Sequence, residues 1–136
     1  MTRILALPVA LVLLVQAVAA ADPRPPLRGV SAIRAGNYGA PSVLLEDRQK
    51  VGPIIEELNA LRSKPWRRGE TRLSCYATVV LLGGKRTLAT LRVRPDLVVE
   101  RSGAKGQASY SIAIGQSDLP GLTTLLSEIA PAQGCK

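Results

Sequence analysis

The chain has 136 residues, with 18 lysines and arginines against 10 aspartates and glutamates, and it contains neither histidine nor phenylalanine. This length suits one domain whose single core is built from leucine, isoleucine, valine and alanine. Histidine is the commonest general base and metal ligand. Its absence argues against histidine-based catalysis and against a metal centre, and we expect no cofactor.

The N-terminus has the layout of a secretory signal peptide. A positive start at 1–3 precedes an apolar run at 4–15 and a small-residue stretch that ends at Ala21. We expect cleavage after Ala21, which makes 1–21 the signal peptide; cleavage after Ala19 is the alternative. The apolar run is shorter than the roughly 20 residues of a spanning helix. We therefore expect no transmembrane span after cleavage, and a periplasmic or secreted protein.

A proline-rich segment opens the predicted mature chain. Residues 22–29 contain three prolines and should form an extended arm. The remainder, 30–136, is expected to fold as a single α+β domain. Within it, Val30–Arg34 would be a short first strand and Ala35–Ser42 a turn-rich loop.

Apolar periodicity predicts a first helix. Asp47 fits an N-cap, and an apolar stripe follows at Val51, Ile54, Ile55, Leu58 and Leu61. Proline is tolerated in a first turn but is costly deeper in a helix, so Pro53 leaves two alternatives. Either the helix begins at Pro53, or it begins near Arg48 and kinks; we favour Arg48. The segment Ser63–Pro65 should end the helix.

Four consecutive strands predict an antiparallel meander, to which Val30–Arg34 would add a fifth strand. The strands are expected at Arg72–Leu82, Thr87–Arg94, Leu97–Glu100 and Ser109–Ile114. A three-residue turn after the first of them would place Ala77 opposite Leu91 and Cys75 opposite Val93. One face of the hairpin then becomes uniformly apolar, which favours this register over a slip of one residue.

A second helix is predicted after the meander. Asp118 is expected to cap it, Pro120 to lie in its first turn and Pro131 to stop it. Its apolar stripe consists of Leu119, Leu122, Leu125, Leu126 and Ile129. Both helices should pack on the apolar face of the sheet, which gives a two-layer α+β fold.

The two cysteines, Cys75 and Cys135, should form one disulfide in an oxidising compartment. The bridge would pin the second helix to the apolar face of the sheet. A redox-active or metal-binding pair is the alternative, which the lack of C-x-x-C spacing disfavours.

The opposite face of the predicted hairpin is polar, basic and uncovered. The register places Tyr76 opposite Arg92, with Arg94 on the same face and Arg72 near Asp96. One interpretation is an ordinary solvated face on which Tyr76 shields the stem of Arg92. The other interpretation is a docking surface for an acidic partner.

The segment Trp66-Arg67-Arg68 precedes the meander and contains the only tryptophan. Tryptophan and arginine are enriched at the energetic centres of protein interfaces. Trp66 is therefore either a contact residue or a lid over the open edge of the core, and both alternatives leave Arg67 and Arg68 exposed.

The remaining motifs disfavour catalysis. Ser109 and Ser111 have no activating partner at a suggestive spacing, and the acidic pairs Glu46-Asp47 and Glu56-Glu57 fit a cap region and a solvated helix face. The segment 103–107 holds two glycines and a lysine but lies between two strands, which disfavours a phosphate-binding loop. We expect neither an enzyme nor, with so few aromatic residues, a nucleic-acid partner.

These features predict a small exported domain with a non-catalytic binding role, either inhibitor-like or accessory. The expected partner is an acidic protein of the cell envelope or exterior. The candidate contact residues are Trp66, Arg67, Arg68, Arg72, Tyr76, Arg92 and Arg94. The alternative function is electrostatic binding of anionic envelope surfaces, such as lipid headgroups or acidic glycans. A small hydrolase is the least favoured function.

Overall fold

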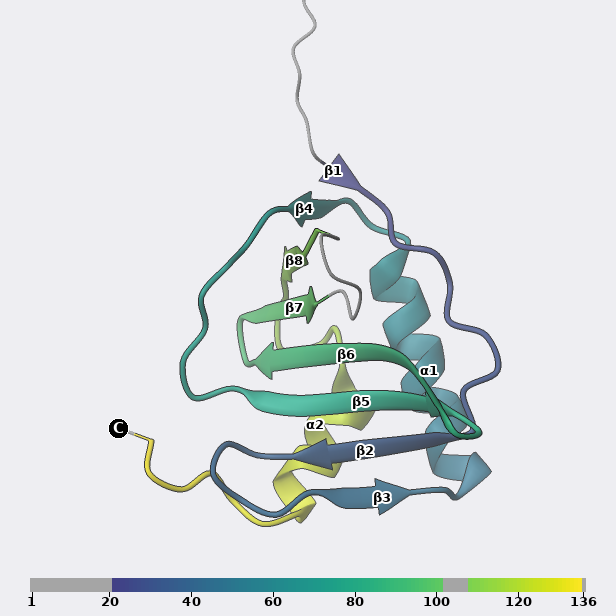
Figure 1. The fold of residues 1–136 in the computed structure, drawn as a ribbon, viewed down its shortest axis with the longest axis vertical. Helices are drawn as coiled ribbons and strands as arrows, with labels where there is room; N and C mark the ends of the chain where they lie inside the picture. Colours follow the sequence, from purple (N-terminus) through teal and green to yellow (C-terminus); the bar gives the residue numbers. More distant parts are fainter. Residues whose placement is uncertain (1–20, 102–107, 136) are drawn as a thin grey trace, which may run out of the picture.

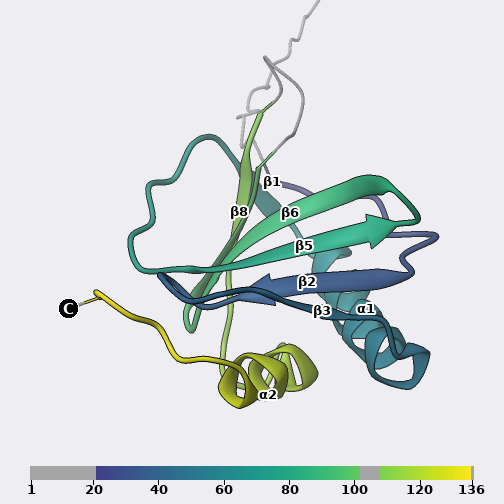
Figure 2. The same cartoon turned by 60° about the horizontal axis from the view of Figure 1, so that its bottom comes forward.

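A computed structural model of the chain describes residues 21–101 and 108–135, which form a two-layer α+β fold (Figures 1 and 2). The strands are β1 (Ala21–Asp22), β2 (Ala32–Gly36), β3 (Val43–Leu45), β4 (Trp66–Arg68), β5 (Ala77–Gly83), β6 (Arg86–Arg94), β7 (Leu97–Arg101) and β8 (Tyr110–Ala113). They pair antiparallel in the order β1-β4-β8-β7-β6-β5-β2-β3. The helices α1 (Arg48–Arg62) and α2 (Pro120–Glu128) cover one face of this sheet, here called the inner face.

The four predicted strands are present as β5 to β8, and β2 supplies the predicted fifth strand, which begins and ends two residues later than predicted. The predicted four-stranded meander nevertheless understates the size of the sheet, because β1, β3 and β4 extend it at both edges. Each of these three strands has only two or three residues. Such short segments cannot display the alternation by which a strand is recognised in a sequence.

The register of the central hairpin differs from the prediction by two residues. Ala77 pairs with Val93 and Val79 pairs with Leu91, because the turn is formed by Gly84 and Lys85 alone and a bulge lies between Leu81 and Leu82. A shift of two preserves the faces, so the predicted apolar face is the inner face. The predicted start of the first strand was wrong as well, since β5 begins at Ala77 and residues 72–76 lie before it.

Helix α1 begins at Arg48, as favoured, and contains Pro53. The side chain of Asp47 accepts a hydrogen bond from the Gln49 backbone N–H at 2.9 Å, which confirms the predicted N-cap. Apolar residues of the helix enter the core, among them Val51, Ile54, Leu58 and Leu61.

Helix α2 ends at Glu128, before Pro131, and its predicted cap was wrong. Asp118 instead accepts a hydrogen bond from the Gly115 backbone N–H at 2.7 Å. That bond and the nearby Lys64 hold the pKa of Asp118 below its usual value, against an opposing effect of desolvation. The first turn of α2 is capped by α1, because the Glu57 carboxylate accepts from the Gly121 N–H at 2.8 and 3.0 Å.

The proline-rich arm lies along α1. The Arg24 backbone N–H donates to the Arg62 carbonyl at 2.7 Å, and the Leu27 N–H donates to the Asn59 side-chain oxygen at 2.7 Å. Leu27 itself belongs to the hydrophobic core. The arm is therefore fixed to the domain by both polar and apolar contacts. Within the described ranges, no helix combines the length and the apolar character needed to cross a membrane.

A buried ionic cluster connects the arm, α1 and the sheet. Glu100 of β7 accepts from the guanidinium groups of Arg62 and Arg24, the second at 3.4 Å. The Arg62 Nε donates to the Pro25 carbonyl at 2.7 Å, and the Arg24 guanidinium carbon lies 3.8 Å from the centroid of the Tyr110 ring. Arg62 and Glu100 are only 5% and 7% exposed, so each depends on the other for compensation of its charge.

Replacing Glu100 with alanine should therefore lower the free energy of unfolding by about 3–5 kcal/mol, since Arg62 would remain buried without its counter-charge. The matched control is Glu56→Ala on the exposed side of α1, which should change stability by no more than about 0.5 kcal/mol. Urea unfolding followed by circular dichroism measures both. Equal stabilities of the two variants would contradict a structural role for the cluster.

Candidate functional site on the outer face of the sheet

The outer face of the sheet, opposite the helices, is defined by the strand register. One row of neighbouring residues contains Thr78, Arg92, Val99 and Ser111, and the next contains Arg34, Val80, Thr90 and Arg101. With Arg67, which pairs with Ser111, the described residues of these rows include four arginines and no carboxylate. This is the polar, basic face that the sequence predicts.

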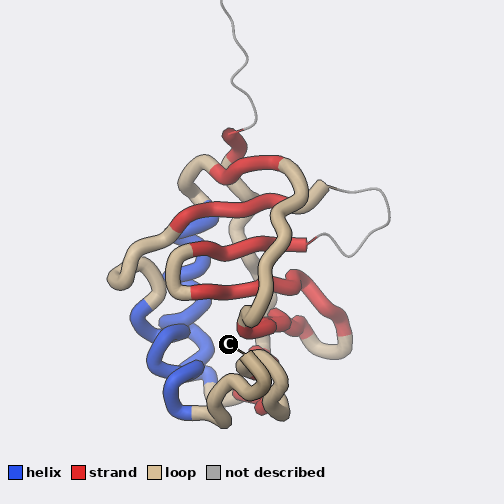
Figure 3. Tube along the Cα trace, turned by 90° about the vertical axis from the view of Figure 1, so that its left-hand side faces the viewer, coloured by secondary structure: helices blue, strands red, loops and turns tan. Residues whose placement is uncertain are grey.

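The outer face is not fully uncovered, which corrects the prediction. Residues 69–76, here called the linker, run from β4 past the neighbouring strands to β5 (Figures 1 and 3). Val99 and Ser111 point outward by register but are only 1% and 4% exposed. The Thr71 hydroxyl lies 3.4 Å from that of Ser111. The linker therefore covers the part of the outer face near β7 and β8.

Tyr76 and Arg92 meet, although not as a directly opposed pair. The register places Thr78 opposite Arg92. The Arg92 guanidinium carbon nevertheless lies 4.7 Å from the centroid of the Tyr76 ring, and Tyr38 contacts the same ring edge-on with centroids 6.4 Å apart. A cation over an aromatic face contributes about 0.5–1 kcal/mol at an exposed site. The stack fixes the direction of both side chains at the end of the linker.

Two hollows open on this face. One, here called the outer hollow, has a volume of about 300 Å³ and is lined by Arg34, Tyr38, Tyr76 and neighbouring residues of β2 and β5. The other, of about 210 Å³, lies between the linker and β6–β7 and is lined in part by Arg72, Arg92 and Arg101. Arg72, predicted near Asp96, therefore belongs to the same surface as Arg92.

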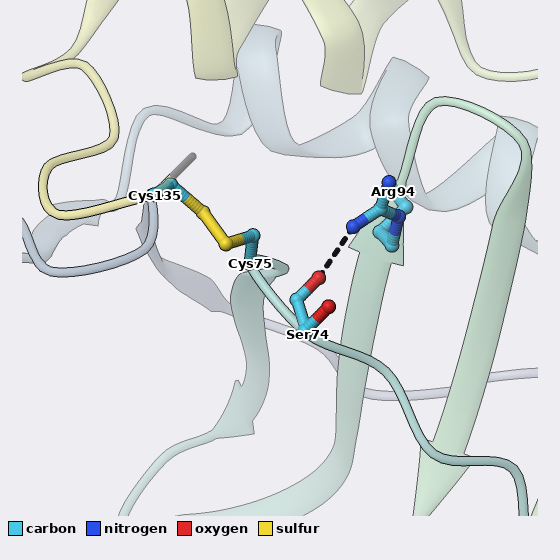
Figure 4. The surroundings of a disulfide bond; sticks show 4 residues. All are labelled: Ser74, Cys75, Arg94 and Cys135. Carbon is cyan, nitrogen blue, oxygen red and sulfur yellow. Dashed lines mark hydrogen bonds between the residues drawn. A yellow bond between two sulfur atoms is a disulfide. The ribbon is translucent and has the colours of Figure 1, made fainter.

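Arg94 fixes the end of the linker. Its guanidinium donates to the Ser74 carbonyl, one residue from the Cys75–Cys135 disulfide (Figure 4). Its Nε lies 3.8 Å from an Asp96 carboxylate oxygen. Cys75 has a φ of 58°, which a non-glycine residue rarely adopts, so the chain turns sharply between the linker and β5.

The segment Trp66-Arg67-Arg68 is strand β4, and alternation sends its side chains to different faces. Trp66 is 1% exposed, and its indole N–H donates to the Leu61 carbonyl at 3.0 Å. Of the two alternatives, the structure therefore places Trp66 in the core as a lid, and its side chain is not available to a partner. Arg67 pairs with Ser111 on the outer face, whereas Arg68 pairs with Tyr110 on the inner side of the sheet edge.

Sequence reasoning missed Arg34, Tyr38 and Leu44 on this surface. Tyr38 is 42% exposed and Leu44 is 48% exposed, and both lie beside Arg34, which pairs with Leu44. Tyr38, Val43 and Leu44 are the large hydrophobic residues that the described part of the chain exposes. Tyr38 could have been noticed as an aromatic residue in a turn segment. Leu44 could not, because β3 was not recognised as a strand.

Most basic groups of the outer face form no described salt bridge, although Glu70 lines the same hollow as Arg72, Arg92 and Arg101. The arginines that lie on the outer face or line its hollows are Arg34, Arg67, Arg72, Arg92, Arg94 and Arg101. Among the described residues, Arg94 is the one of these arginines that forms a salt bridge. No group of three histidine, cysteine or acidic side chains that could hold a metal occurs in the described ranges. Comparison with protein-family models, curated proteins and solved structures found no match, so functional inference rests on this geometry.

The placement of Trp66 predicts opposite outcomes for two neighbouring substitutions. Trp66→Ala should lower the free energy of unfolding by about 3–5 kcal/mol, because it removes a large buried side chain. Arg67→Ala, at an exposed position of the same strand, should change it by no more than about 0.5 kcal/mol. Denaturant titration measures the free energy of unfolding of both variants. A Trp66→Ala variant as stable as Arg67→Ala would contradict the core position.

Proposed function

We propose that the protein is an exported, non-catalytic binding domain that holds an acidic protein partner on the outer face of its sheet. The contact surface, here called the outer patch, consists of Arg34, Tyr38, Leu44, Tyr76 and Arg92. Arg72, Arg94 and Arg67 would extend it along the same face. Arginine and tyrosine are the residue types that dominate binding energy at protein interfaces.

One observation carries the choice of a protein over a simple anionic surface. Tyr38 and Leu44, both more than two-fifths exposed, lie beside Arg34, and the Tyr76–Arg92 stack lies next to Tyr38. A surface that binds by charge alone needs no exposed aliphatic or aromatic groups. Apolar anchors among unneutralised cations suit a partner that offers carboxylates around an apolar centre. Binding to lipid headgroups or acidic glycans is the alternative.

Export is supported by the predicted signal peptide at 1–21 and by the disulfide, which is consistent with an oxidising compartment. Except for Ala21, the predicted signal peptide lies outside the described residues. Ala21 of β1 pairs with Arg67 of β4. We place the mature protein in the periplasm or outside the cell.

A non-catalytic role is supported by the structural contacts of the carboxylates and the serine that a small hydrolase could use. Glu100 is held by arginines, Glu57 caps α2, and Ser111 lies under the linker beside Thr71. Each of these groups has a structural contact within the fold. We propose no cofactor and leave the small hydrolase as the least favoured function.

Affinity capture with paired charge-reversal variants tests the proposal. Proteins of an envelope extract are captured on the immobilised protein, identified by mass spectrometry, purified and titrated against it. Arg34→Glu with Arg92→Glu removes two cations of the outer patch. Arg48→Glu with Lys50→Glu changes the net charge equally on the exposed start of α1. The outer-patch variant should bind the captured partner with an affinity lower by about 30-fold or more, whereas the affinity of the α1 variant should change little.

Salt and vesicles separate the alternative function. A partner anchored by Tyr38 and Leu44 should keep much of its affinity at about 0.5 M salt, where charge-only binding is screened within a few ångströms. The electrostatic alternative is correct if the protein binds anionic vesicles, if both variants weaken that binding equally, and if high salt abolishes it. Equal weakening of a protein partner by both variants would contradict the outer patch.

A further inference from the structure

A half-open cavity lies between helix α2 and the inner face of the sheet, on the side of the sheet opposite the outer patch. Its volume is about 540 Å³. Sites that bind small molecules typically measure about 300–1,000 Å³. The lining residues come from the β2–β3 loop, the start of β5, the end of β6, the segment around β8, α2 and the chain after it.

The walls of this cavity are mainly apolar and come from both layers. Val93 and Ile114 line it from the sheet side, and Leu119 and Leu126 from the helix side. Leu126 is only partly buried, although it belongs to the apolar stripe of α2. A half-open, mainly apolar space of this size between two layers has the form of a small-molecule site.

The cavity is held open by contacts at both ends of α2. At its start, the Glu57 carboxylate accepts from the Gly121 N–H at 2.8 and 3.0 Å. At its end, the Asn37 side-chain amide donates to the carbonyls of Leu126 at 2.8 Å and Ala130 at 2.9 Å. These contacts fix the helix to α1 and to the β2–β3 loop. They oppose collapse of α2 onto the sheet, so the cavity is preformed.

The charge at the cavity wall indicates the polarity of its ligand. Arg94 lines the cavity while its guanidinium also donates to the Ser74 carbonyl, and none of the other lining residues carries a charge. Its carboxylate neighbour, Asp96, lies 3.8 Å away and has a side chain 81% exposed. Uncharged hydrogen-bonding groups from Asn37, Gln116 and Ser127 complete the polar part of the lining. An apolar space with one cation suits a molecule with an apolar tail and an anionic head.

We propose that this cavity binds a single-chain fatty acid, with its alkyl chain between α2 and the sheet and its carboxylate at Arg94. The ligand would bury the exposed parts of Leu126 and Ile114, and its carboxylate would accept hydrogen bonds from the guanidinium group. Of the outer-patch residues, Tyr38 alone lines the cavity. The proposed contacts of the alkyl chain and the carboxylate do not use Tyr38, so the inference does not depend on the outer patch.

Two adjacent threonines of α2 provide a matched test of the cavity. Thr123 lines it and Thr124 does not, and both are exposed. Binding of monomeric dodecanoate is measured by isothermal titration calorimetry on the purified protein, after circular dichroism has verified folding. The wild type and Thr124→Trp should bind alike, whereas Thr123→Trp, which fills the cavity, should weaken binding at least tenfold. Equal affinities of the two tryptophan variants, or no binding by the wild type, would overturn the proposal.

The role of Arg94 is tested with a second pair of variants and a neutral probe. Arg94→Gln should weaken dodecanoate about tenfold, the usual effect of losing a hydrogen bond to a charged group. It should leave dodecyl maltoside binding unchanged. Arg101→Gln, which removes a cation of the outer face that does not line the cavity, should change neither. Equal loss with Arg101→Gln would place the carboxylate on the outer face and overturn the assignment. If dodecanoate binds only when phospholipid vesicles are present, the ligand is not a free fatty acid and the proposal is overturned.

Discussion

The bond between Cys75 and Cys135 is the constraint on which both proposed sites depend. It joins the end of the linker to the chain that follows α2, across a sequence separation of 60 residues. Closing a loop of that length removes unfolded-state entropy equivalent to about 4 kcal/mol, a large fraction of the stability of a small domain. On one side of the bond, Tyr76 is directed to Arg92 on the outer face. On the other side, Cys75 itself forms part of the cavity wall.

The two proposed sites also meet at Tyr38 and at Arg94, which lines the cavity and would extend the outer patch. Tyr38 lines the outer hollow and the cavity, and its carbonyl accepts from the Gln133 N–H at 2.7 Å, close to the disulfide in the sequence. A partner on the outer patch and a ligand in the cavity would therefore both contact Tyr38. Should both bind, this residue is where the binding of one would influence the binding of the other. The ionic cluster of Glu100 lies elsewhere, at the arm, where it stabilises the scaffold without contributing to either site.

Much of this fold could be predicted from the sequence because the signals were local and repeated. The start of α1, the faces of β5 and β6, and the pairing of two cysteines follow from a cap, from alternation and from an even cysteine count. The exact register could not be predicted, since a turn of two residues followed by a bulge gives the same faces as a turn of three. Tyr76 and Arg92 were predicted to lie directly opposite each other; they are in contact, but Thr78 is the residue opposite Arg92. Leu44 and the cavity were not predictable, because they depend on a three-residue edge strand and on the distance between two layers.

The disulfide itself can be tested most directly in the cell. Free thiols are alkylated before lysis, and the protein is then digested without reduction and analysed by mass spectrometry. We expect a linked pair of peptides that contains Cys75 and Cys135, with neither cysteine alkylated. Alkylation of both cysteines in the native protein would contradict the bond, and with it the placement of Tyr76 and of the cavity wall.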